Sequence, residues 1–128
     1  MIKAGFSIIE ITPPSGLYMA GYAARNSPAN GKKDSLTVRA IVVEKTALVV
    51  ADVIGIDAEM SAKVRKKSIL PDQAITITAT HTHGGPISMK DRLNSKVNFK
   101  FYNILEKALT DSIKIAYENR TYVKLYGG

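Results

Sequence analysis

Residues 47–79 read ALVVADVIGIDAEMSAKVRKKSILPDQAITITA, and this stretch decides the fold. Its first five residues are apolar on both faces, which is typical of a central strand covered on both sides. Asp57 can cap a helix that runs to about Ile69 and is closed by Pro71. The β-branched run Ile75–Ala79 then predicts a second strand.

A strand, a helix and a second strand in succession form a βαβ unit, which is almost always right-handed. The two strands should therefore be parallel, whether or not they are adjacent in the sheet. Their carboxyl ends then share one edge, where ligands gather in open α/β sheets. We expect Asp52 and His81 to lie on that rim, because each follows the end of one of these strands.

The preceding residues add a strand, a long loop and a hairpin. Ala4–Ile11 is rich in isoleucine and predicts a strand, which the prolines of Thr12–Gly16 end. Gly16–Ser35 has no sustained period and is interpreted as a long ordered loop, a type of segment that often carries function. The β-branched run Thr37–Glu44 precedes the strand Ala47–Ala51 and predicts a hairpin with it.

The residues that follow predict a helix and a last strand. Apolar side chains recur at spacings of three and four from about Val97 to Glu118, as in an amphipathic helix, and Thr121–Tyr126 resembles a strand. The expected architecture is α/β, with a mixed central sheet, a hairpin and a right-handed βαβ unit flanked by two main helices. We expect residues 1–128 to form a single domain.

The composition narrows the class of protein. The chain is 45% hydrophobic and has no cysteine, so disulfides and thiolate metal sites are excluded within it. No apolar run approaches the ~20 residues of a membrane helix, and the first residues do not resemble a signal peptide, so we expect no membrane span and a cytoplasmic location. The net charge is +7. Its densest basic cluster, Lys63–Lys67, lacks interleaved aromatics, so we interpret it as a solvated helix face and expect no nucleic-acid partner.

Residues 80–86 read THTHGGP and contain both histidines of the chain. In an extended backbone His81 and His83 would project to the same face and could approach one metal ion. The alternative interpretation is a pair of histidines at a solvated loop end. A metallo-β-lactamase motif fails because Gly85 and Pro86 stand where an aspartate and a histidine are needed. A TIM-barrel amidohydrolase needs a far longer chain. Nucleophile-elbow and phosphate-loop motifs are absent from the sequence.

The order of these segments resembles the N-terminal part of the neutral (non-lysosomal) ceramidases and their prokaryotic relatives. The resemblance covers nearly the whole chain, and the Thr-His-Thr-His-x-x-Pro block is its most specific element. The matching segments are Ala4-Gly5, Ile11–Pro14, Met19–Tyr22 with Arg25, Arg39-Ala40, Asp52 after Val49-Val50, and Ala79–Pro86.

That family consists of zinc-dependent amidohydrolases that cleave the N-acyl bond of ceramide. The resemblance implies that His81 is a zinc ligand and that His83 is a catalytic residue positioning water or substrate. Separately, the shared rim suggests that Asp52 accepts a hydrogen bond from a ligand imidazole, although it could equally cap the turn after its strand. Gly21, Tyr22 and Arg25 belong either to a substrate-pocket wall or to a packed structural loop.

The chain departs from the family in lacking the histidine, glutamate and tyrosine that complete the zinc site later in a longer chain. Tyr117, Tyr122 and Tyr126 match no motif for the missing tyrosine. Three hypotheses follow. In the first, the chain is a fragment that needs a second polypeptide to hydrolyse an N-acyl lipid or another N-acyl substrate. In the second, it is a homo-oligomer that shares a metal between subunits. In the third, it is a noncatalytic domain. We expect no activity from the chain alone, because a catalytic zinc normally has three protein ligands.

Overall fold

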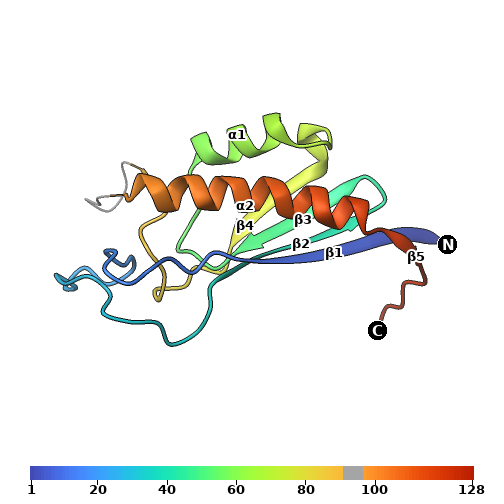
Figure 1. Ribbon diagram of the computed structural model, residues 1–128. Helices are drawn as coiled ribbons and strands as arrows, with labels where there is room; N and C mark the ends of the chain where they lie inside the picture. Colours follow the sequence, from blue (N-terminus) through green and yellow to red (C-terminus); the bar gives the residue numbers. More distant parts are fainter. Residues whose placement is uncertain (91–96) are drawn as a thin grey trace.

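The computed structural model describes residues 1–90 and 97–128, which form a sheet covered by two helices (Figure 1). The sheet has five strands in the order β4-β3-β2-β1-β5. The strands are β1 (Ile2–Glu10), β2 (Thr37–Val43), β3 (Thr46–Ala51), β4 (Ile75–Ala79) and β5 (Thr121–Val123), and the helices are α1 (Ala58–Lys67) and α2 (Phe99–Glu118). The predicted α/β class with a mixed sheet and two main helices is confirmed.

The parallel pair that holds the rim is formed by β3 and β4. Ala47 pairs with Ile75 and Ala51 with Ala79, so the two strands are adjacent as well as parallel. The hairpin is also confirmed, because β2 and β3 pair in antiparallel fashion around a turn at Glu44, whose φ is 53°. All other neighbouring strands of the sheet are antiparallel.

Both helices begin at capping residues. The Asp57 carboxylate accepts a hydrogen bond from the Met60 amide at 2.8 Å, and this predicted cap starts α1. Asn98 caps α2 in the same way, by accepting from Phe101. α1 ends at Lys67, two residues before the predicted end, and β5 ends at Val123 rather than Tyr126. Neither helix in the described part of the chain is long and apolar enough to cross a membrane.

The core lies between the helices and one face of the sheet. Alternate residues of β2 and β3 are at most 1% exposed on that face, and they pack with the apolar stripe of α2. Figure 1 shows α1 and α2 on the same side of the strands. β1 approaches α2 closely at Gly5, where a Cβ atom would lie 2.0 Å from the Ala116 carbonyl oxygen.

The opposite face of the sheet is not covered by the described residues. We call this side of the sheet the open face. Its large apolar side chains are half exposed: Phe6 (54%), Ile8 (58%), Ile41 (44%) and Leu48 (49%). Phe6 pairs with Ile41 and Ile41 with Leu48, so three of them form one row across β1, β2 and β3. The prediction that Ala47–Ala51 is covered on both sides was therefore wrong for this chain, because its two helices pack on the same face.

Candidate functional site

The candidate site lies where β3 and β4 end side by side. The Thr80 amide donates to the Ala51 carbonyl at 3.0 Å, so the segments that follow β3 and β4 leave the sheet side by side. Asp52 and His81 are the next residues of the two segments. The structure therefore confirms that both follow the carboxyl ends of adjacent parallel strands.

His81 has a constrained backbone and a fixed ring. Its φ is 60°, in the left-handed region that few residues other than glycine adopt, so the backbone is not extended there. The ring Nδ1 lies 2.8 Å from the Ile54 carbonyl oxygen. Because a carbonyl oxygen only accepts, Nδ1 donates and carries the proton in the neutral ring, which leaves the Nε2 lone pair free.

His83 lies beside His81, with 5.2 Å between the ring centroids and 64° between the ring planes. The structure thus brings the two imidazoles together, as predicted, although the left-handed His81 replaces the expected extended geometry. Within residues 1–90 and 97–128, no group of three or more His, Cys, Asp or Glu side chains is arranged to hold a metal ion. The described part of the site therefore brings together two imidazoles.

The predicted loop residues pack directly against His83. The Tyr22 ring meets the His83 ring edge to face, with a centroid distance of 5.1 Å and an interplanar angle of 84°. The Arg25 guanidinium lies 4.9 Å from the centre of the Tyr22 ring, and its Nη1 donates to the His83 carbonyl at 3.2 Å. Gly21 is also adjacent to His83. Whether these residues contact a substrate stays a prediction.

Asp52 is not oriented towards the histidines. Its Oδ2 accepts three hydrogen bonds, from the Thr37 amide at 2.9 Å, the Thr37 hydroxyl at 2.8 Å and the Arg39 guanidinium at 3.1 Å. The predicted bond to an imidazole is not among the hydrogen bonds of the described residues, and the Ile54 carbonyl takes that place. The two-residue alternation of β3 explains this, because it places Asp52 on the same face of the sheet as Thr37 and Arg39 rather than on the face that the helices cover. In the alternative interpretation this carboxylate caps the turn after its strand, whereas its hydrogen bonds join the end of β3 to the start of β2.

The loop that carries Ile54 is anchored by contacts that the sequence did not indicate. Ser88 Oγ donates to the Gly55 carbonyl at 2.7 Å. The Asp57 carboxylate accepts from the Lys90 amide at 3.0 Å and from the Tyr102 hydroxyl at 2.9 Å. Burial and the hydrogen bond to Asp57 both raise the pKa of Tyr102. Residues distant in sequence thus position the carbonyl that orients His81.

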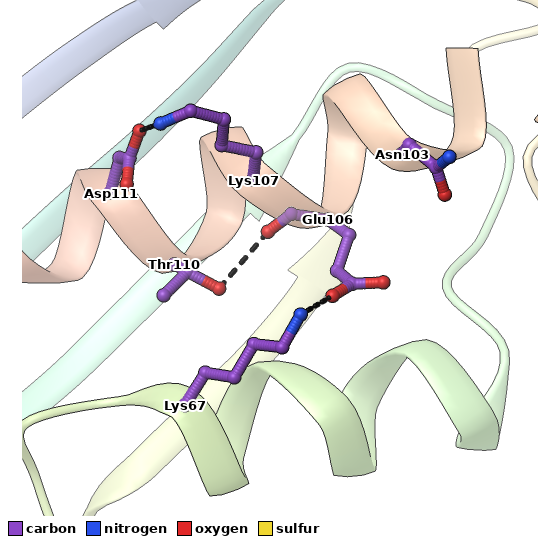
Figure 2. Close-up of a pocket in the computed structure, with 6 residues that line it drawn as sticks. All are labelled: Lys67, Asn103, Glu106, Lys107, Thr110 and Asp111. Atoms are coloured by element: carbon purple, nitrogen blue, oxygen red, sulfur yellow. Dashed lines mark hydrogen bonds and ion pairs between the residues drawn. The ribbon is translucent and has the colours of Figure 1, made fainter. Parts of the chain in front are cut away.

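A shallow hollow of about 440 Å³ lies elsewhere, between α1 and α2 (Figure 2). Two ion pairs occupy its lining, Lys67 with Glu106 and Lys107 with Asp111. Asn103 and Thr110 complete the lining residues. All six residues come from the end of α1 and from α2, so the hollow does not extend the histidine site.

Comparison with known protein families and with curated proteins gives no match. Comparison with solved structures gives a close match in fold. The crystal structure of neutral ceramidase from Pseudomonas aeruginosa aligns with a TM-score of 0.81 and 21% identity, over 93% of this chain and 22% of that chain. A ceramidase complexed with C2 aligns with a TM-score of 0.80 and 23% identity, over 93% of this chain and 21% of that one. The predicted resemblance is confirmed at the level of the fold, and the chain spans about a fifth of the length of these proteins.

Proposed function

We propose that this chain is the histidine-bearing part of a zinc-dependent amidohydrolase of the ceramidase type, which cleaves N-acyl amide bonds. The observation that carries the proposal is the pair of adjacent imidazoles at the edge of a parallel strand pair. That pair lies within a fold shared with two solved ceramidase structures. The substrate class, an N-acyl lipid or a related N-acyl compound, follows from the same likeness.

The donor set fits zinc in part. His81 would bind through Nε2, because its Nδ1 is engaged by the Ile54 carbonyl. A catalytic zinc normally has three protein ligands and an open position. The described residues bring together only the two imidazoles, so we infer that a second polypeptide segment, or another copy of the chain, supplies the remaining ligands. Bound zinc would supply Lewis-acid activation of water and of the acyl carbonyl.

The reaction assigned to this site is amide hydrolysis. The oxygen of water forms a bond to the acyl carbon, the C–N bond breaks, and the amine leaves after gaining a proton. The second proton of the water also ends on the amine, so the products are a carboxylate and a protonated amine. His83 lies beside His81 and is half-buried. An imidazole can accept and donate hydrogen bonds and transfer a proton, so His83 is suited to orient the water or to pass its proton to the amine.

A chimeric enzyme tests this proposal. Residues 1–128 replace the matching part of the P. aeruginosa neutral ceramidase, so that the remainder of that enzyme supplies the missing groups. We expect the chimera to hydrolyse an N-acyl sphingosine and to lose at least a hundredfold of its activity in the His81→Ala variant. Thr78→Ala, at an exposed position on β4, the strand that precedes His81, is the matched control. A folded chimera with no activity, or one indifferent to His81→Ala, would contradict the proposal.

A further inference from the structure

The loop before β2 is attached to the segment that carries His83 by main-chain bonds. Met19 and Pro86 form an isolated antiparallel bridge. The Ala20 amide donates to the Gly85 carbonyl at 3.0 Å, and the Ile87 amide donates to the Tyr18 carbonyl at 3.2 Å. The loop is therefore held in fixed register with the residues that directly follow His83.

From this attachment the side chains form a continuous row. The Arg25 guanidinium contacts the Tyr22 ring, the Tyr22 ring contacts the His83 ring, and the His83 ring contacts the His81 ring. The row ends at the Ile54 carbonyl, which His81 binds. Arg25 also holds the main chain of His83 through its bond to the carbonyl oxygen, so it restrains this residue in two ways.

Gly21 leaves the space that the His83 ring occupies. A Cβ atom at Gly21 would lie 2.3 Å from Cγ and 2.5 Å from Cβ of His83, which is closer than any real contact. Gly21 also has a φ of 103°, which L side chains rarely adopt. The backbone of the loop therefore limits the positions of the His83 ring from one side, and Tyr22 limits them from another.

We propose that Arg25 and Tyr22 are positioning residues for His83, holding its imidazole against His81 so that the His81 ring is prearranged to bind metal with His83 beside it. This assigns the loop a role other than that of a pocket wall. A side chain fixed by its neighbours loses less conformational freedom on binding, so removing the restraint should weaken metal binding by roughly tenfold. The effect on zinc rests on the proposed function, whereas the placement of the ring does not.

The test uses the full chain without metal and then with zinc. The chain has only two histidines, so their ring proton signals in an NMR spectrum are few and can be assigned with a His81→Ala variant. We expect Tyr22→Leu and Arg25→Ala to shift the His83 ring signals, and Tyr22→Phe to retain most of the wild-type shifts because it keeps the ring. Zinc affinity, measured by competition with a chromophoric chelator, should fall about tenfold in Tyr22→Leu.

Two controls separate positioning from a general structural effect. Tyr18→Leu removes a half-exposed tyrosine of the same loop, and Lys32→Ala removes a loop cation that pairs with Glu10. Both should leave the His83 signals and the zinc affinity within twofold of wild type. If Arg25→Ala fails to fold, Tyr22→Leu decides the question, because the Tyr22 side chain is 58% exposed.

The outcomes distinguish the two proposals. His83 signals that stay at their wild-type positions in Tyr22→Leu and Arg25→Ala would overturn the positioning role, even if zinc binds. His83 signals that move in a chain whose wild type binds no zinc would support the positioning role and contradict the zinc site. Shifted signals together with weakened zinc binding support both.

Discussion

The ring Nδ1 of His81 lies 2.8 Å from the carbonyl oxygen of Ile54. Ile54 lies in the loop after β3 and His81 follows β4, and these two strands are adjacent and parallel. The loop after β3 therefore sets the orientation of the His81 ring, which is proposed to bind metal. The left-handed backbone of His81 brings its ring within reach of that carbonyl. The orientation of this ligand is therefore a property of the paired strand ends rather than of the histidine segment alone.

The first prediction concerns the tautomer of His81. Because Ile54 offers only an acceptor, the neutral ring should carry its proton on Nδ1 and leave Nε2 unprotonated. A long-range ¹H–¹⁵N NMR spectrum above pH 8 distinguishes the two nitrogens, and His81→Ala assigns the signals. A proton found on Nε2 would contradict the geometry and would remove the basis for metal binding through that atom.

A second prediction separates Asp52 from the metal site. Asp52→Ala leaves the Thr37 amide and hydroxyl without their acceptor and should lower the free energy of unfolding by about 1–3 kcal/mol. Zinc affinity should stay within twofold of wild type, because the carboxylate bonds no imidazole. Arg39→Ala, which removes a half-exposed ion-pair partner and its hydrogen bond to the Thr37 hydroxyl, should cost less than about 1 kcal/mol. A tenfold loss of zinc affinity in Asp52→Ala would restore the role first predicted for it.

The close approach of β1 and α2 yields a third prediction. Gly5→Ala places a Cβ atom against the Ala116 carbonyl, a backbone group that cannot move independently of α2. We expect the free energy of unfolding to fall by more than about 2 kcal/mol in urea denaturation. Gly31→Ala is the control, since nothing lies within 4 Å of its Cβ position. Equal stability of the two variants would mean that the strand and the helix are further apart than described.

Tyr102 makes the free energy of unfolding depend on pH in the alkaline range. Its pKa is raised above the ordinary value of about 10, first by burial and then by the bond to Asp57, so the folded state keeps a proton that the unfolded state releases. The stabilisation is full below about pH 10 and declines as the pH rises further. Urea denaturation at pH 9 and pH 11 should show a larger fall in the free energy of unfolding for wild type than for Tyr102→Phe. Tyr126→Phe, at an 87% exposed side chain, should lose as much as wild type.

Much of the fold could be predicted because its signals are local. The β-branched run Ile75–Ala79 forms a strand with those bounds, and Asp57 caps α1 by a bond to an amide three residues on. The hairpin and the crossover likewise depend on patterns within a few tens of residues. Errors at the element ends, such as the shorter β5, arise where pairing with β1 rather than propensity sets the boundary.

The site was predictable in its residues but not in its geometry. The THTHGGP block indicated His81 and His83, yet a main-chain carbonyl such as that of Ile54 carries no sequence signal. Asp52 was placed on the correct rim. Whether its side chain bonds β2 or an imidazole depends on which face of the sheet it occupies, and this depends on which face the helices cover. The packing of Tyr22 on His83 joins segments about 60 residues apart, which no local pattern reveals.

The open face sets the colloidal behaviour of the isolated chain. Phe6, Ile41 and Leu48 present adjoining apolar surface, while the net charge of +7 makes copies repel one another. At about 0.1 M salt such repulsion extends only ~10 Å, and it shortens further as salt is added. The chain should therefore stay dispersed in dilute buffer and cluster in concentrated salt, so ionic strength becomes the condition to fix before any affinity for metal or partner is compared between variants.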